Sequence, residues 1–137
     1  MTDFQYAGTH LVCDAYDIDP AVITHNDRIV SEISSGIRSS GATLCGIQIK
    51  EFDPAGLTAV FLLAESHVSV HTYPEHRALF ADVFTCGSTV DPRRILEALL
   101  ESLGDCSYTA SVIDRGISLD SAHSAETFVK GDKVLVG

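Results

Sequence analysis

Residues 57–86 read LTAVFLLAESHVSVHTYPEHRALFADVFTC, and this stretch decides the fold. Leu57–Ala64 is almost wholly apolar, which is typical of a central strand. Val68–Tyr73 and Ala78–Thr85 are two further runs rich in β-branched and aromatic residues, and Pro74 ends the first of them. A parallel crossover needs a dozen or more residues, and the gaps here are much shorter. The stretch therefore predicts neighbouring antiparallel strands.

Three further strands are predicted outside this stretch. Cys45–Lys50 alternates apolar and polar residues, so it is expected to place one face on the core and the other near water. A turn at residues 53–56, Asp-Pro-Ala-Gly, separates it from Leu57. Thr9–Ile18 is rich in apolar and β-tolerant residues and predicts a first strand. The Asp-Pro pair that follows is expected to end it, because the residue before proline disfavours the helical conformation. Cys106–Asp114 predicts the last one.

Two amphipathic helices complete the pattern. Asn26 or Thr24 is the expected cap of the first helix, and Gly41 is its expected left-handed end. Asp91 caps the second helix, which stops before Gly104. The apolar positions of the first recur every four residues, at Ile29, Ile33 and Ile37. Those of the second form one stripe, made by Ile95, Leu96, Leu99, Leu100 and Leu103.

The order of elements predicts an α+β fold with two layers, a mainly antiparallel sheet and two helices on one of its faces. The uncovered apolar face must be buried against something, and a second copy is the simplest cover. We therefore expect a homodimer with its sheets packed face to face, which makes a four-layer αββα sandwich. Residues 115–137 are polar with weak periodicity and predict a loosely ordered tail, with a short strand at Lys133–Val136.

Composition limits the function. Residues 1–137 suit a single domain, and 45% apolar content suffices for a core. A net charge of −10 repels phosphate backbones and anionic lipids, so neither nucleic acid nor a membrane surface is an expected partner. The sequence shows no apolar run long enough to span a membrane and no secretory signal at residues 1–10, which predicts a cytoplasmic protein.

The four cysteines lie far apart in the sequence and form no CxxC pair. In a reducing compartment they are expected to remain thiols. Cys13, Cys45 and Cys106 lie within apolar runs and are expected to be inert, buried residues. Cys86 differs, because it follows the densest cluster of reactive side chains.

That cluster begins at Glu65 and ends at Cys86. Side chains two apart on a strand share a face. The polar ones are expected to project together: His67, Ser69, His71, Tyr73 and Glu75.

Residue chemistry alone leaves three hypotheses for this face. His67 and His71 are potential metal ligands, although their spacing suits a helix better than a strand. Ser66 is a potential nucleophile for a Ser-His hydrolase, although it lacks the flanking glycines of a GxSxG elbow. The third hypothesis is a polar strand face exposed to solvent, with His71 an ordinary titratable residue.

Residues 64–75, AESHVSVHTYPE, followed by residues 82–87, DVFTCG, resemble the signature of the bacterial and archaeal S-adenosylmethionine decarboxylases. The resemblance extends in weaker form from His10 through residues 40–43 to about Arg115. It implies a short, pyruvoyl-dependent proenzyme that cuts itself between Glu65 and Ser66. In such families the serine hydroxyl attacks the preceding carbonyl, the ester undergoes β-elimination, and the new N-terminus becomes a pyruvoyl group.

The products implied are a β chain of residues 1–65 and an α chain of residues 66–137, held together by one sheet. The pyruvoyl group formed from Ser66 binds the substrate amine as a Schiff base, so neither a metal nor pyridoxal phosphate is expected. By resemblance, His71 assists self-processing and Cys86 returns a proton to the substrate carbon. Thr58 stands where the family usually has a serine hydroxyl that helps processing, which predicts slower processing because threonine is stiffer.

The resemblance also implies a binding site for S-adenosylmethionine. Phe52 and Tyr73 match aromatic residues that sandwich the adenine, and Glu75 matches the carboxylate that holds the ribose hydroxyls. Tyr73 replaces the usual tryptophan, so an arginine or ornithine decarboxylase of the same fold is an alternative. A second alternative is an inactive regulatory paralogue. The implied role is to supply aminopropyl groups for spermidine synthesis, with each site near the dimer interface.

Overall fold

The computed structural model describes residues 6–87, 90–116, 125–129 and 134–136. These residues form one sheet in the order β2-β3-β4-β5-β1-β6-β7-β8, and every neighbouring pair is antiparallel. The strands are β1 (Gly8–Tyr16), β2 (Leu44–Glu51), β3 (Leu57–Leu63), β4 (His67–Tyr73), β5 (Ala78–Cys86), β6 (Ser107–Arg115), β7 (Ala125–Val129) and β8 (Val134–Val136). The helices are α1 (Pro20–Ile23), α2 (Asn26–Ser39), α3 (Pro92–Leu103) and the 3-10 turn η1 (Pro74–His76).

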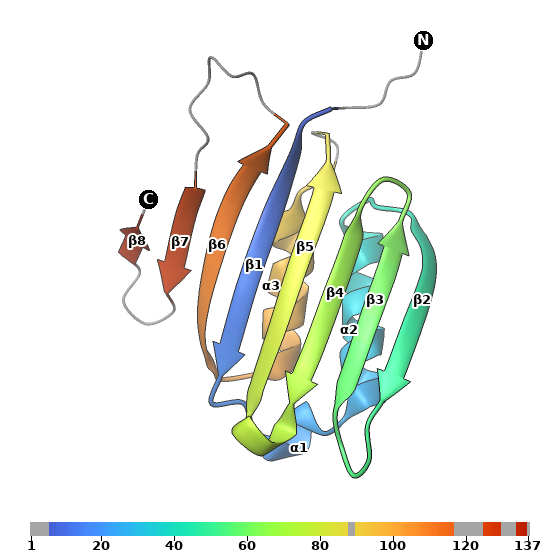
Figure 1. Ribbon diagram of the computed structural model, residues 1–137, viewed down its shortest axis with the longest axis vertical. Coiled ribbons are helices and arrows are strands. Elements are labelled where there is room, and N and C mark those ends of the chain that lie inside the picture. The colour runs from blue at the N-terminus through green and yellow to red at the C-terminus, as the bar shows by residue number, and fades with distance from the viewer. Residues whose placement is uncertain (1–5, 88–89, 117–124, 130–133, 137) are drawn as a thin grey trace.

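Helices α2 and α3 lie side by side on one face of the sheet and leave the other face open (Figure 1). This confirms the predicted α+β class, the antiparallel sheet and the helices on one face. Among the described helices, none is long and apolar enough to cross a membrane. The predicted boundaries of β1 to β6 agree with the structure to within two residues.

The core fills the space between the helices and the sheet. Phe61 of β3, Val68 of β4 and Val83 of β5 stand opposite one another in register, and each is at most 1% exposed. The predicted apolar stripes of both helices pack on this face; the fully buried members are Ile29, Ile33, Ile37, Ile95, Leu99 and Leu103. Burial of this kind stabilises the fold by roughly 1.5–3 kcal/mol for each large side chain.

The helix ends show one wrong prediction. His25, not Asn26 or Thr24, caps α2, because its Nδ1 accepts a hydrogen bond from the backbone N–H of Arg28 at 3.2 Å. The Thr24 hydroxyl instead donates to the carbonyl of Pro20. The other two predictions are confirmed, since Asp91 caps α3 and Gly41 has a φ of +91°.

Strand β2 is more exposed than predicted. Ile47 and Ile49 stand opposite the buried Phe61 and Ala59, on the helix side, yet they are 37% and 49% exposed. The reason is that β2 is the outermost strand of the sheet. Cys45 is exposed rather than buried, because the register shifts between Leu44 and Gly46 and leaves the intervening residue in a bulge.

The prediction for residues 115–137 did not include strand β7, and residues 117–124, 130–133 and 137 of this tail lie outside the described residues. Strand β7 pairs with β6, and β8 pairs with β7. The short strand predicted at Lys133–Val136 corresponds to β8, although Lys133 itself lies outside the described residues. Strands β7 and β8 are held by backbone hydrogen bonds to the edge of the sheet. Such pairing does not require a regular pattern of apolar side chains, so the sequence did not predict β7.

Candidate active site

A tight turn joins β3 to β4 and contains the Glu65–Ser66 peptide bond. The backbone N–H of Leu63 donates to the carbonyl oxygen of Ser66 at 3.0 Å, so that Ala64 and Glu65 form a two-residue loop. Both loop residues are exposed and Ser66 is half-buried. The bond between Glu65 and Ser66 therefore lies at one end of the sheet, accessible and held by the hairpin.

Cys86, the last residue of β5, contacts both sides of this bond. Its backbone N–H donates to Ser66 Oγ at 3.1 Å. Its Sγ donates to the carbonyl oxygen of Glu65, also at 3.1 Å. A donor on a carbonyl oxygen favours attack at the carbonyl carbon, because it stabilises the negative charge that develops on that oxygen. The Ser66 hydroxyl, the Glu65 carbonyl and the Cys86 thiol thus meet where the β3–β4 turn contacts the end of β5.

A cavity of about 330 Å³ adjoins the turn. Its lining includes Ser66 and Cys86 together with residues 41–43, which follow α2. Gly41 there has open space around it and a left-handed backbone, so the chain bends away after α2 and leaves room beside Ser66. The cavity is large enough for part of a small-molecule substrate.

A second group of candidate residues surrounds another cavity, of about 370 Å³. Thr58 and His71 are direct cross-strand partners, and Thr58 Oγ1 lies 3.1 Å from His71 Nδ1. Phe52 lies over Gly56, where an added Cβ would be 3.4 Å from the Phe52 Cβ and 3.6 Å from its ring. The aromatic and carboxylate candidates line the same cavity, as Phe52, Tyr73 and Glu75.

The two groups lie at opposite ends of the sheet. In Figure 1 the β3–β4 turn and the end of β5 are at the top, and η1 and the β2–β3 turn are at the bottom. His71 is five residues along β4 from Ser66, which corresponds to about 16 Å between their Cα atoms. One chain therefore does not bring Ser66 and His71 into contact, which rules out a Ser-His pair within a protomer.

The hypothesis of a metal bound by His67 and His71 is also wrong. Both side chains project from the open face, as predicted, but four residues of strand separate them by about 13 Å. Glu75, predicted to continue this face, lies in η1 instead.

A polar network that the sequence did not reveal surrounds Asp82 of β5. Its carboxylate accepts hydrogen bonds from His10 Nε2 at 2.6 Å, from His67 Nε2 at 3.0 Å and from the hydroxyl of Ser69. Burial raises the pKa of Asp82, but these hydrogen bonds outweigh it and hold the pKa below its ordinary value of 3.8. The signal in the sequence was weak, because His10 and Asp82 are 72 residues apart.

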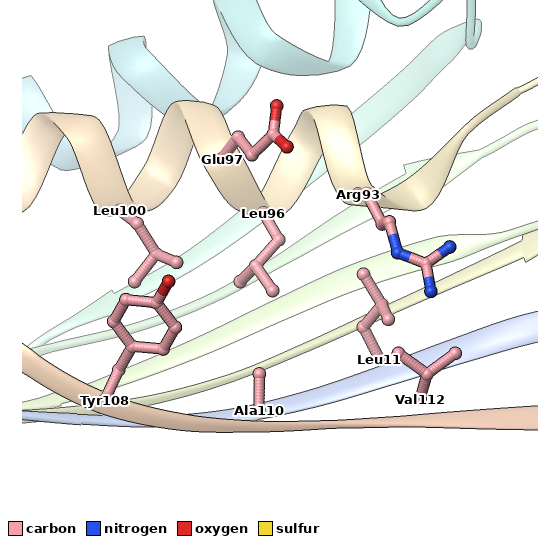
Figure 2. Close-up of a pocket in the computed structure, with 8 residues that line it drawn as sticks. All are labelled: Leu11, Arg93, Leu96, Glu97, Leu100, Tyr108, Ala110 and Val112. Carbon is pink, nitrogen blue, oxygen red and sulfur yellow. The ribbon is translucent and has the colours of Figure 1, made fainter. Parts of the chain in front are cut away.

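A third cavity, of about 250 Å³, lies on the helix side between α3 and strands β1 and β6. Figure 2 shows Leu96 and Leu100 pointing from α3 toward the strands, Leu100 near Tyr108 and Leu96 above Ala110, with Glu97 turned away. None of the candidate catalytic or binding residues lines it. We regard it as a gap in the packing at the edge of the core.

The fold and the β3–β4 turn together define the class of protein. It is a two-layer α+β protein with an antiparallel sheet, in which the Ser66 hydroxyl, the Cys86 thiol and the Glu65 carbonyl meet at one hairpin. The family model described as S-adenosylmethionine decarboxylase matches residues 9–116. The chain belongs to this family.

Relatives and a solved structure agree with this assignment. The S-adenosylmethionine decarboxylase proenzyme of Hydrogenobaculum sp. (strain Y04AAS1) is 36% identical over 83% of this chain and 85% of its own length. That of Archaeoglobus fulgidus is 34% identical over 80% of this chain and 97% of its own length. The crystal structure of the adenosylmethionine decarboxylase from Aquifex aeolicus superposes with a TM-score of 0.75 at 28% identity, covering 90% of this chain and 100% of that one.

Proposed function

We propose that this protein is a self-processing, pyruvoyl-dependent S-adenosylmethionine decarboxylase, which produces the aminopropyl donor of spermidine synthesis. Family membership supports the substrate, and the relatives are named as proenzymes. The observation that carries the proposal is the pair of Cys86 contacts on the two sides of the Glu65–Ser66 bond. The protein acts in the reducing cytoplasm, where Cys86 stays a thiol.

Self-processing begins when Ser66 Oγ attacks the carbonyl carbon of Glu65. The Cys86 thiol donates to the carbonyl oxygen as its charge develops. An ester replaces the peptide bond, and β-elimination then leaves the oxygen with Glu65 as a carboxylate. Hydrolysis of the dehydroalanine at position 66 releases ammonia and leaves the pyruvoyl group. Residues 1–65 and 66–137 stay together as one domain, because β3 and β4 pair across the cut.

A pyruvoyl carbonyl at position 66 would supply the electron-withdrawing group that binds the substrate amine, in place of pyridoxal phosphate or a metal. Cys86 delivers a proton to the substrate carbon, and its Sγ contact with the Glu65 carbonyl oxygen beside position 66 supports this role. Phe52 and Tyr73 sandwich the adenine, and Glu75 holds the ribose hydroxyls. The cavity that these three residues share supports this assignment.

The two groups of site residues require a second copy of the chain. Ser66 and Cys86 lie at one end of the sheet, while His71 and Thr58 lie about 16 Å away. When two open faces pack with their strands running in opposite directions, the first group of one protomer meets the second group of its partner. The active site is then shared, and His71 with Thr58 assists the processing of the partner chain.

The open face has the surface that such a dimer needs. Several of its large apolar side chains are exposed by 38% to 58%: Val12, Tyr16, Val60, Leu62, Phe80 and Ile113. Sheets pack face to face when apolar side chains of both interdigitate. The homodimer of processed protomers is thus an αββα sandwich.

Intact mass spectrometry under denaturing conditions tests the proposal. Wild-type protein is expected as two fragments that meet at Glu65–Ser66, the second lighter by one ammonia than a chain starting with serine. Ser66→Ala, which lacks the attacking hydroxyl, is expected as one uncut chain. A cut in Ser66→Ala would refute the mechanism, and an uncut wild-type chain would favour the inactive regulatory paralogue.

Carbon dioxide release from each amine then tests the substrate. We expect release from S-adenosylmethionine. Release from arginine or ornithine alone would show instead that Tyr73 and Phe52 do not form an adenine site.

A further inference from the structure

The Asp82 network lies directly beside the residue on which the proposed function rests. His67, one of its members, is the residue that follows Ser66. Its ring packs against Phe84 and His10, at centroid distances of 5.9 Å and 5.8 Å, and its Nε2 donates to Asp82. Phe84 is also its cross-strand partner on β5. His67 is therefore fixed to β5 by side-chain contacts as well as by the ladder.

Cutting the chain changes what holds position 66. The covalent link to the turn is lost, and Ser66 Oγ leaves with Glu65, so the hydrogen bond from the Cys86 backbone N–H to that oxygen is lost as well. The hydrogen bond from the Leu63 N–H to the carbonyl oxygen of residue 66 remains. The first side chain that can anchor the new chain end is that of His67.

We propose that His67, held by Asp82, is a positioning residue that keeps the newly cut end of β4 in place beside Cys86. The inference rests on the proposed function, because it concerns the cut chain. Placement matters here, since a displacement of about 1 Å at a reacting group can cost roughly 100-fold in rate. Neither His67 nor Asp82 needs to touch the substrate for this role.

The hydrogen bonds favour positioning over acid-base chemistry. An ionised carboxylate only accepts, so His10 and His67 both carry their proton on Nε2. Arg115 Nη1 lies 3.2 Å from His10 Nδ1 and donates to it, which fits the same tautomer. The lowered pKa of Asp82 keeps it charged at neutral pH. The histidine nitrogens that face Asp82 and the Asp82 carboxylate thus already have hydrogen-bond partners.

The same hydrogen bonds argue against a metal site at Asp82. His10, His67 and Asp82 bring one potential ligand atom each to within 4.8 Å of one another. A cation there would need the lone pair of each Nε2, and both of these nitrogens already lie within hydrogen-bond distance of Asp82. The guanidinium of Arg115 against His10 would add repulsion. The structure therefore assigns the three residues to a hydrogen-bonded anchor.

The test compares His67→Ala, His67→Gln and Asp82→Ala in the full-length protein. Glutamine can place an amide N–H where His67 has its Nε2–H, so it should restore the anchor. Asp27→Ala is the matched control, because Asp27 is an exposed carboxylate in the first turn of α2, in the helix layer rather than on the open face. Self-cleavage is followed by mass, and hydrogen exchange is measured on the peptide that begins at residue 66 of the cut protein.

We expect complete cleavage in every variant, because the turn contacts of Ser66 act before the cut. In His67→Ala and Asp82→Ala, exchange at residues 67–69 should rise about tenfold, since the chain end opens more readily. The kcat for S-adenosylmethionine should fall about 10- to 100-fold while KM changes little. His67→Gln should recover most of both, and Asp27→Ala should match wild type.

Unchanged exchange and kcat in His67→Ala would overturn the inference, as would a failure of that variant to cleave. The His67 variants decide the test by themselves if Asp82→Ala does not yield folded protein. Failure of the proposed function is distinguished by the wild type, which would then remain uncut or release no carbon dioxide.

Discussion

The thiol of Cys86 has two proposed roles at the β3–β4 turn. In the uncut chain it donates to the Glu65 carbonyl oxygen, and after the cut we propose that it delivers the proton to the substrate carbon. Cys13 differs, because burial, the nearby Asp14 and Cys106 raise its pKa to about 12. Cys86, by contrast, is only half-buried, at the end of β5 and against the β3–β4 turn.

The Cys86→Ser variant separates the proposed role of the thiol in self-processing from its proposed role in protonating the substrate carbon. The serine hydroxyl still donates to the Glu65 carbonyl, so the chain should still cut itself. Turnover should fall by roughly 10²–10⁴-fold, because a hydroxyl releases its proton far less readily than a thiol. Mass spectrometry gives the first result and carbon dioxide release the second. Cys45→Ser, an exposed thiol in the β2 bulge, is the control and should change neither. Wild-type turnover in Cys86→Ser would assign the proton to another group.

At the scale of elements, the packing of α2 on α3 depends on a glycine. Gly36 is buried in α2, and a Cβ added there would lie 2.6 Å from the Cβ of Ala98 in α3. An alanine side chain has no flexible end that can move aside. The two helices approach closely here, which lets both of their apolar stripes reach the same sheet face.

Gly36→Ala should therefore destabilise the protein although alanine favours helix. We expect a loss of about 1–3 kcal/mol, because the helices must shift apart. Urea unfolding measures it. Gly46→Ala in the exposed strand β2 is the control, since an added Cβ there meets nothing within 4 Å. An unchanged urea midpoint for Gly36→Ala would show that the helices separate at no cost.

At the scale of the whole molecule, the proposed site is complete only across two protomers. Ser66→Ala and His71→Ala should each fail to process alone. In a mixed dimer, the His71→Ala chain offers Ser66 and the Ser66→Ala chain offers His71, so one shared site is intact. Co-expression of the two chains should restore cleavage of the His71→Ala chain, measured by mass.

A third chain provides the control for this experiment. Ser66→Ala combined with His71→Ala offers neither group and should restore nothing when co-expressed with His71→Ala. Absence of rescue by the single Ser66→Ala chain would contradict a shared site and require His71 to act within its own chain.

Most of the elements and their faces could be predicted from the sequence. The strands from β1 to β6 and both main helices repeat short, local patterns, and burial follows directly from those periods. The wrong predictions concern features that side-chain periodicity does not show. His25 caps α2, a bulge in β2 leaves Cys45 exposed, and β7 pairs with the edge of β6. Each depends on a backbone partner that side-chain periodicity does not encode.

The sequence by itself determined which residues form the strands and helices, the shared face of His67, Ser69 and His71, and the reactive run around Ser66. Only the tertiary structure decided which side chains meet. It placed Cys86 against the Glu65 carbonyl, joined His10 to Asp82 across 72 residues, and separated Ser66 from His71 at opposite ends of β4. The physical reason is that periodicity is a property of neighbours along the chain. Contact between strands depends on sheet order and register, which distant segments determine together.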